Sequence, residues 1–240
     1  MHARDILKHE KHRSFKYPNR KWTYYQEWNK AIFLHWEVNP ELIEPYLPKG
    51  IKLDIINGKT WLSLVAFDMN NIGIKNVPKI PYISDFQEIN IRVYVIYNNK
   101  PSVYFLSMEG SKKASCVLLK MLSKFPYRFS RMNRNETDYS SQNSVFNDCF
   151  HVSYKLDNKP VQKDEIDLWL TERYAVFQDY KRHIIEYDVH HIEWPMQNIV
   201  TNKLEINYPR FKHLINNRPH KIHFSSGVQV LTWNKVKHPI

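Results

Sequence analysis

Four polar side chains occupy alternate positions in residues 86–95, namely Glu88, Asn90, Arg92 and Tyr94. On a β-strand, alternate side chains point to the same face, so these four would form one row opposite a row of isoleucine and valine. An acid, an amide, a guanidinium and a phenol are groups that bind a small polar molecule and transfer protons on it. Two interpretations stay open: the row is the solvated outer face of a half-exposed sheet, or a polar wall of a pocket inside a barrel.

A second group of chemically capable residues follows a helix-breaking proline, in the run Phe125-Pro126-Tyr127-Arg128. Tyr127 offers a hydrogen-bonding phenol, and Arg128 offers a fork of donors that binds anions. An aromatic–basic turn after a helix also serves purely structural purposes. We treat Glu88 and Tyr127 as candidate catalytic residues. The candidate ligand-binding residues are Glu88, Asn90, Arg92, Tyr94, Tyr127 and Arg128.

A third charged pair, Glu172 and Arg173, follows the apolar residues Trp169 and Leu170. An unpaired charge in such surroundings is costly, so we expect both side chains to be paired and mainly structural. A wall of the ligand site is the alternative interpretation, because a buried ion pair alone does not identify a function.

Several other chemistries lack their sequence signals. The chain has only five glycines and no glycine-rich phosphate loop. Twelve histidines are present, but no H-E-x-x-H motif, and the neighbours His190 and His191 would face opposite sides of a strand. No G-x-S-x-G motif supports a serine nucleophile. We therefore expect no metal site and no cofactor.

The cysteines and the N-terminus indicate a cytoplasmic protein. Cys116 and Cys149 are far apart and form no C-x-x-C pair, which favours reduced thiols over a disulfide. Cys116 falls on the apolar face of a helix, a poor place for a reactive thiolate. The first residues are basic without an apolar run, unlike a secretory signal, and no stretch is long and apolar enough to span a membrane.

The formal net charge of +11 allows a second class of function. A basic protein binds nucleic acid or an acidic partner when its charges gather on one surface. Here the charges are spread along the chain, which favours an ordinary soluble surface, and no known nucleic-acid motif is present. The residues that would form such a basic surface are Arg128, Arg131, Arg134, Arg210, Lys212, His213, Arg218 and Lys221.

The hydrophobic pattern predicts an α+β protein with a mainly antiparallel sheet, closed into a barrel or left open. Strands are expected at residues 31–38, 51–56, 60–69, 86–97, 102–108, 149–156, 174–179, 183–193 and 222–236. Helices are expected at residues 3–11, 112–124, 164–173 and 209–216, the first of them exposed and basic. Asn57-Gly58 predicts a type I′ hairpin turn, and the polar residues 133–148 predict a loop.

A set of short motifs, in order along the chain, resembles the YqjF-like family of uncharacterised bacterial proteins. Each motif is weak alone, but the series extends from about Trp28 to Trp233. The motifs are Leu47-Pro48-Lys49-Gly50 with Leu53-Asp54, the Phe86–Val95 row, Phe125-Pro126-Tyr127, Leu170-Thr171-Glu172-Arg173-Tyr174, His191 with Trp194-Pro195-Met196, and His223-Phe224-Ser225 with Gly227-Val228.

The resemblance places the chain with the acetoacetate decarboxylase-like superfamily. It implies a cone- or barrel-like antiparallel sheet with a few helices, an internal pocket, and room for homo-oligomers. It also implies that Glu88 corresponds to the pocket glutamate of the decarboxylase. The decarboxylase's arginine near the start of a strand has no clear match, because Asn29 or Lys30 stands there.

The resemblance departs at the nucleophile. Acetoacetate decarboxylase forms a Schiff base through one of two tandem lysines after an aromatic–proline pair. Tyr127 and Arg128 stand at those positions here, and neither side chain forms an imine. The tandem pair Lys112-Lys113 is a rival candidate, but it precedes the helix and is expected to be exposed.

These observations favour a single domain over residues 1–240, with residues 1–27 as a basic N-terminal extension. The leading interpretation is a pocket protein for a small polar, anionic organic molecule, without a Schiff-base lysine. Whether it only binds or also catalyses stays open, and catalysis would be acid–base chemistry of a lyase or isomerase type. A basic-surface protein for nucleic acid or an acidic partner is the alternative. The sequence does not decide whether Glu172 and Arg173 belong to the pocket.

Overall fold

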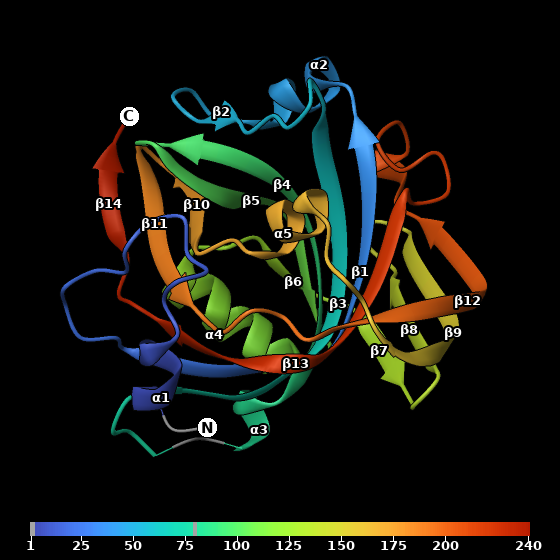
Figure 1. Cartoon of the computed structure of the whole chain (residues 1–240), viewed down its shortest axis with the longest axis horizontal. Coiled ribbons are helices and arrows are strands. Elements are labelled where there is room, and N and C mark those ends of the chain that lie inside the picture. Colours follow the sequence, from blue (N-terminus) through green and yellow to red (C-terminus); the bar gives the residue numbers. More distant parts are fainter. Residues whose placement is uncertain (1–2, 79–80) are drawn as a thin grey trace.

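The computed structural model describes residues 3–78 and 81–240, and it is dominated by one strongly curved sheet (Figure 1). The strands are β1 (Tyr24–Val38), β2 (Lys52–Leu53), β3 (Thr60–Ile74), β4 (Phe86–Tyr97), β5 (Lys100–Gly110), β6 (Tyr127–Phe129), β7 (Arg131–Arg134), β8 (Asp138–Asn143), β9 (Asp148–Pro160), β10 (Ala175–Tyr180), β11 (His183–His190), β12 (Met196–Asn207), β13 (Lys221–Thr232) and β14 (Val236–Pro239). The helices are α1 (Ala3–Lys8), α2 (Pro40–Ile43), α3 (Pro81–Ser84), α4 (Lys113–Ser123) and α5 (Glu165–Thr171), with 3₁₀ turns η1 (Glu44–Tyr46) and η2 (Pro209–Phe211). None of the helices in the described part of the chain has the length and apolar character needed to cross a membrane.

The strand order closes a barrel. Starting from β11, neighbouring strands are β10, β5, β4, β3, β1 and β13, and β13 pairs back onto β11. That last pairing joins Val189 to Thr232 and His190 to Leu231. Most pairings are antiparallel, while β10 and β6 run parallel to β5. The prediction of an α+β fold with a mainly antiparallel, barrel-like sheet is therefore confirmed.

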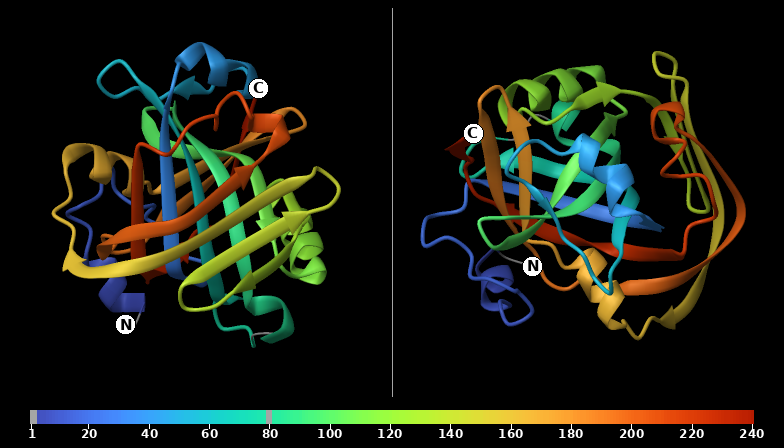
Figure 2. Two further views of the ribbon diagram at one scale, coloured as in Figure 1. Left: turned by 90° about the vertical axis from the view of Figure 1, so that its right-hand side faces the viewer. Right: turned by 90° about the horizontal axis from the view of Figure 1, so that it is seen from above.

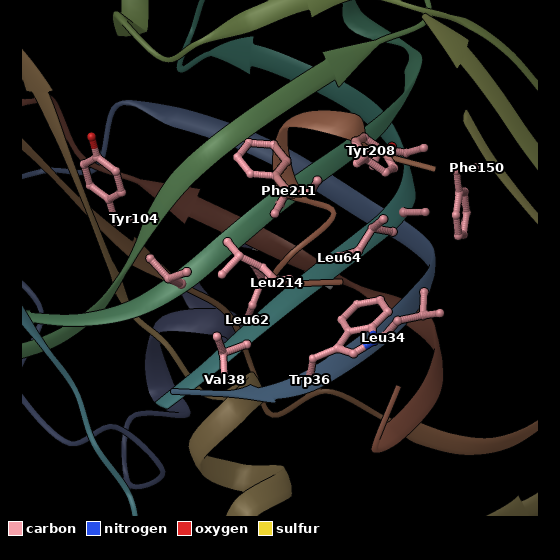
Figure 3. Close-up of a cluster of buried hydrophobic side chains, with 14 of the residues drawn as sticks. Leu34, Trp36, Val38, Leu62, Leu64, Tyr104, Phe150, Tyr208, Phe211 and Leu214 are labelled. Atoms are coloured by element: carbon pink, nitrogen blue, oxygen red, sulfur yellow. The ribbon is translucent and has the colours of Figure 1, made fainter. Parts of the chain in front are cut away.

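A second layer covers one side of the barrel. On its other edge, β13 pairs with β12, and the next neighbours in the sheet are β9, β8 and β7. These strands form a layer that curves around the barrel wall (Figure 2). The space between the two layers is a hydrophobic core, which Figure 3 shows with side chains from β1, β3 and β9 and from the segment around η2. Phe150, Tyr208 and Phe211 lie in this core.

Strand β4 separates this core from the barrel interior. Its isoleucine and valine side chains, such as Ile89 and Ile91, are fully buried in the core between the layers. Its polar side chains point the other way, yet Glu88 is only 2% exposed and Arg92 only 9%. The interpretation of the polar row as a solvated outer face is therefore wrong, because the closed barrel encloses that face.

Some elements differ from the sequence prediction. Residues 133–148, expected as a loop, include the end of β7 and all of β8, which form a hairpin, and β12 was not predicted. In β8 the buried positions include Ser141 and Asn143. These positions therefore lack the alternating apolar side chains by which a strand is predicted from sequence. The Asn57-Gly58 turn has positive φ at both residues and a bridge between Ile56 and Lys59. However, β2 pairs with β4 rather than extending this hairpin.

The N-terminal segment packs on the seam of the barrel. Ile6 on α1 is buried against Leu231 of β13 and against Trp233, which follows β13. Helix α1 is therefore not fully exposed, contrary to the expectation from the sequence. Arg13 donates a 2.6 Å hydrogen bond to the carbonyl of Val189 on β11. Its guanidinium also lies 4.4 Å from the centre of the Tyr174 ring. The segment therefore supports the short β11–β13 pairing that closes the barrel.

Gly227 on β13 allows β1 to approach closely. It has φ +130° and pairs with Asn29, beside an irregularity in β1 where Lys30 also has positive φ. A Cβ atom on Gly227 would lie 2.5 Å from the carbonyl oxygen of Trp28. A side chain at this position is therefore excluded by both conformation and space.

We predict that Gly227→Ala lowers the free energy of unfolding by about 3 kcal/mol, because backbone strain and steric overlap add. Gly58→Ala is the matched control, since Gly58 has φ +74° but a Cβ atom added to it would meet no other atom within 4 Å. It should cost only about 1 kcal/mol. Urea unfolding of both variants measures the difference, and equal losses would contradict the steric argument.

Candidate functional site

A cavity of about 290 Å³ lies inside the barrel. Most of the described lining side chains are apolar or aromatic and come from β1, β3, β5, β11 and α4. The polar side chains include Glu88, Asn90 and Arg92 on β4, together with Tyr127, Thr171, Arg173 and His191. Ile74, Val77 and Leu122 also line the cavity and are exposed, so we call these three residues the rim. The arginine end is buried, and the rim opens near α3 and α4.

Glu88 and Tyr127 form the central hydrogen bond of the cavity. The Tyr127 hydroxyl donates to Glu88 Oε2 at 2.6 Å, and Asn90 Nδ2 donates to Glu88 Oε1 at 3.2 Å. Burial raises the pKa of Glu88 to about 7, against the opposing effect of these two donors. Burial and the neighbouring Glu88 raise the pKa of Tyr127 well above its usual value. Near neutral pH, Glu88 therefore exchanges a proton readily while Tyr127 stays a donor.

Two guanidinium groups meet at the buried end of the cavity. Arg92 Nη2 donates to the carbonyl of Leu170 at 3.2 Å, and Arg173 Nη1 pairs with Asp54 Oδ2 at 2.5 Å. Arg173 Nε donates to the carbonyl of Trp169 at 2.6 Å. Burial lowers the pKa of Arg173, and the nearby charge of Arg92 acts in the same direction. The two buried cations thus repel each other.

Three side chains in the cavity wall each have one buried polar atom without a hydrogen-bond partner. These atoms are Arg92 Nε, Arg173 Nη2 and Asn90 Oδ1, and they have no partner among residues 3–78 and 81–240. Buried polar groups in native proteins are normally paired, so orphaned donors in a cavity need an explanation. A bound anion would satisfy the two guanidinium donors.

Helix α5 positions the backbone carbonyls that accept hydrogen bonds from Arg92 and Arg173. The helix starts with a capping box, in which Asp164 and Asp167 each accept from the other's backbone N–H. Lys221 pairs with both carboxylates. The helix ends at Thr171, which places the carbonyl of Leu170 where Arg92 and Tyr94 both donate to it.

Glu172 holds the chain beyond α5. It accepts hydrogen bonds from Lys163 and the backbone N–H of Trp194, each at 3.2 Å, and from the Tyr174 hydroxyl. Trp194 in turn stacks on Trp28 with ring centres 6.0 Å apart, and both rings line the cavity. Glu172 therefore has contacts of a structural residue, whereas Arg173 is both paired and part of the cavity wall. No local sequence pattern predicts the ion pair between Arg173 and Asp54, which holds Arg173 in the cavity wall, because the two residues lie far apart along the chain.

Two predicted ligand-binding residues lie outside the described cavity lining. The Tyr94 hydroxyl is 2.6 Å from Ser63 Oγ and donates at 2.9 Å to the Leu170 carbonyl, which also accepts from Arg92. Arg128 pairs with Glu109 at 3.3 Å and with Asp148 at 3.0 Å. Adjacent residues of a strand face opposite sides, so on β6 Tyr127 enters the cavity while Arg128 points away from it.

The residues of the alternative basic surface are divided between two environments. Arg128, Arg134, Arg210 and Lys221 are committed to ion pairs within the chain. Arg131, Lys212, His213 and Arg218 are exposed. Half of the proposed basic residues are thus already neutralised, which weakens the case for a nucleic-acid or acidic-partner surface.

Other reactive groups lie away from the chemistry. The Cys116 thiol donates to the carbonyls of Gly110 and Arg128, and burial raises its pKa to about 12. Lys113 is exposed, and no lysine is among the described residues that line the cavity. No cluster of three or more metal-binding side chains occurs within the described residues.

Comparisons with known proteins agree with the fold and the family. A family model for DUF2071, an uncharacterized conserved protein, matches residues 25–229. The uncharacterized protein YqjF of Bacillus subtilis (strain 168) is 30% identical over 231 residues, which is 90% of this chain and 93% of YqjF.

Solved structures share the fold at low sequence identity. An acetoacetate decarboxylase-like enzyme from Sphingomonas wittichii RW1 matches with a TM-score of 0.64 and 11% identity, over 95% of this chain and 98% of its own. The enduracididine biosynthesis enzyme MppR complexed with pyruvate matches with a TM-score of 0.62 and 10% identity, over 93% of this chain and 91% of its own. The chain therefore has the acetoacetate decarboxylase-like fold.

The raised pKa of Glu88 predicts a pH-dependent cost to stability. Because the folded-state pKa of about 7 lies above the usual value of 4.5, the folded chain resists ionisation between these pH values. The free energy of unfolding should therefore fall as pH rises from 4.5 to about 7 and then level off, by about 3 kcal/mol at most from this group.

Glu88→Gln should remove this contribution, so the variant gains stability relative to the wild type as pH rises. Urea unfolding at several pH values between 4.5 and 8 measures the difference. Glu41→Gln, at an exposed position, is the control and should track the wild type. A constant difference between Glu88→Gln and the wild type at every pH would contradict the raised pKa.

Proposed function

We propose that this chain, which belongs to the DUF2071 family, binds a small organic carboxylate in its barrel cavity, where Glu88 can transfer protons while Tyr127 donates a hydrogen bond to it. The observation that carries the proposal is the pair of unsatisfied donors on the buried Arg92 and Arg173. Both side chains line the cavity and are at most 9% exposed.

The charge balance of the cavity favours an anion. Arg173 is paired with Asp54, but the described contacts give Arg92 a carbonyl and two aromatic rings and no carboxylate. Glu88 is the carboxylic acid of the described lining, and its raised pKa leaves it largely neutral below pH 7. An uncompensated buried cation is costly, so a carboxylate that pairs with the guanidinium groups would stabilise the site.

Glu88 and Tyr127 would supply acid–base chemistry. As a carboxylate, Glu88 can remove a proton from a carbon or hydroxyl of the bound molecule, and as an acid it can return that proton. Tyr127 donates to Glu88 Oε2 and would keep the carboxyl group oriented during the transfer. The reaction class that fits is a lyase or isomerase type of proton transfer, with no group of the chain covalently bound to the substrate.

Two further observations support a carboxylate ligand without imine chemistry. MppR, a neighbour in fold, is known complexed with pyruvate, itself a small carboxylate. In this chain a phenol, Tyr127, occupies the cavity beside Glu88, and the lysines near α4 lie outside the described lining. The proposal therefore places Glu88, Asn90, Arg92, Arg173 and Tyr127 at the ligand, and leaves Tyr94 and Arg128 in supporting positions.

We predict that Arg92→Met weakens carboxylate binding by about 10- to 100-fold, the loss expected for one charge-assisted hydrogen bond. Calorimetry with hexanoate and its neutral amide, at fixed pH and ionic strength, measures the charge preference. The wild type should prefer hexanoate, and Arg92→Met should lose that preference without a lower melting temperature, because a repelling cation is removed. Arg131→Met, at an exposed position, is the matched control. Equal affinity of the wild type for acid and amide would overturn the proposed function.

We also predict that borohydride traps no imine. The protein is incubated with acetoacetate or pyruvate, reduced with sodium borohydride, and measured by intact mass and peptide mapping. The mass should match that of protein reduced without the oxo acid. A stable adduct on Lys112, Lys113 or another lysine would show that a Schiff-base route exists.

A further inference from the structure

The polar groups of the cavity are arranged in a line rather than around a point. Glu88, Asn90 and Arg92 occupy alternate positions on β4 and pair in regular register with Phe67, Val65 and Ser63 on β3. At about 3.3 Å per residue, the Cα atoms of Glu88 and Arg92 are roughly 13 Å apart along the strand. A molecule that reaches both ends must be elongated.

The Arg92 side chain does not shorten this distance by turning towards Glu88. Its Nη2 donates to the Leu170 carbonyl, which also accepts from Tyr94, two residues further along β4. The guanidinium carbon lies 5.8 Å from the centre of the Tyr94 ring, and that of Arg173 lies 5.1 Å from the same ring. Both cations are therefore held at the far end from Glu88.

The part of the cavity beyond Glu88 is apolar. Its described walls come from the end of β3, from the residues that follow β3, and from α3 and α4, and none of these apolar wall residues carries a charge. They include Met69, Ile72, Ile74, Val77, Ile83, Leu118 and Leu119. The cavity ends at the rim, where Ile74 is 45% exposed, Val77 51% and Leu122 48%.

The size of the cavity also exceeds that of a small oxo acid. Its volume of about 290 Å³ equals that of roughly ten water molecules at ~30 Å³ each. A molecule such as pyruvate, held at the arginines, would leave the apolar half without a partner. Apolar cavity walls that stay in contact with water contribute no binding free energy. A hydrocarbon tail packed against these walls would contribute through the apolar surface that it buries.

We propose that the cavity takes an elongated aliphatic monocarboxylate, with its carboxylate at Arg92 and Arg173 and its hydrocarbon tail running past Asn90 and Glu88 towards the rim. This inference rests on the proposed function, since it needs the carboxylate at the arginines. It places the Glu88–Tyr127 pair beside the chain of the ligand rather than beside its carboxylate. Proton transfer there would require that the chain carries a hydroxyl, or a carbon next to a carbonyl group, at the level of Glu88.

The test is a homologous series of butyrate, hexanoate, octanoate and decanoate, with pyruvate and acetoacetate, measured by calorimetry below their aggregation concentrations. Burial of one methylene contributes enough for about a fourfold gain in affinity. We expect the Kd to fall about fourfold per methylene and then level off once the tail reaches the rim.

Two substitutions on α4 locate the tail. Leu119 lines the cavity, so Leu119→Trp should weaken octanoate binding at least tenfold and leave butyrate unchanged. Leu119→Ala should move the levelling point to a longer chain, which keeps the test valid if the tryptophan variant misfolds. Val117→Trp is the matched control, because Val117 lies on the same helix and is 62% exposed. Equal effects at both positions would overturn the placement of the tail.

The outcomes separate this inference from the proposed function. If pyruvate or acetoacetate binds more tightly than octanoate, and Arg92→Met removes that binding, the ligand class is wrong while the proposed function stands. If the neutral amide of hexanoate binds as tightly as hexanoate, or no carboxylate binds, the proposed function fails and the inference fails with it.

Discussion

The structure depends on the short pairing between β11 and β13 that closes the barrel. Val189 pairs with Thr232 and His190 with Leu231, and the backbone N–H of Trp233 donates to the carbonyl of Asp188 at 3.1 Å. The N-terminal segment packs over the same place through Ile6 and Arg13. Without closure, the polar row of β4 would face water, and its charges would be ordinary surface charges. With closure, the same row becomes the wall of a low-dielectric cavity, where each charge is costly unless it is paired.

Burial then explains the chemistry of the site. It raises the pKa of Glu88 into the neutral range and that of Tyr127 above it, so one group transfers protons and the other donates hydrogen bonds. Burial also leaves Arg92 and Arg173 close to each other with unsatisfied donors. A cavity that holds two cations against apolar walls is less stable than a fully apolar one would be. Such a cost is typical of a site that is completed by its ligand.

The comparison with acetoacetate decarboxylase-like proteins separates scaffold from chemistry. The barrel is shared at TM-scores of 0.62–0.64, although only 10–11% of residues are identical. A shared fold does not transfer an activity, because activity depends on the groups that line the cavity. Here Tyr127 lies next to Glu88, at the position where the resemblance to acetoacetate decarboxylase would place a lysine. The comparisons therefore establish the scaffold alone, and the proposed preference for proton transfer over imine formation rests on the groups inside the cavity.

Local patterns in the chain were enough to predict the alternation of β4, the helix α4 and the turn at Asn57-Gly58, and the family resemblance linked Glu88 with the Phe125-Pro126-Tyr127 segment. These features depend on local periodicity, on residues that tolerate positive φ, or on motifs in fixed order. The alternation itself did not show which face of β4 is enclosed, since a period of two does not distinguish the inside of a barrel from its outside. The resemblance favoured the polar face, and the closed barrel decides it. Folding also brings Arg173 and Asp54 together over a separation of 119 residues and turns Arg128 away from the cavity. Contacts of that range depend on how the strands are ordered, which no local pattern in the chain encodes.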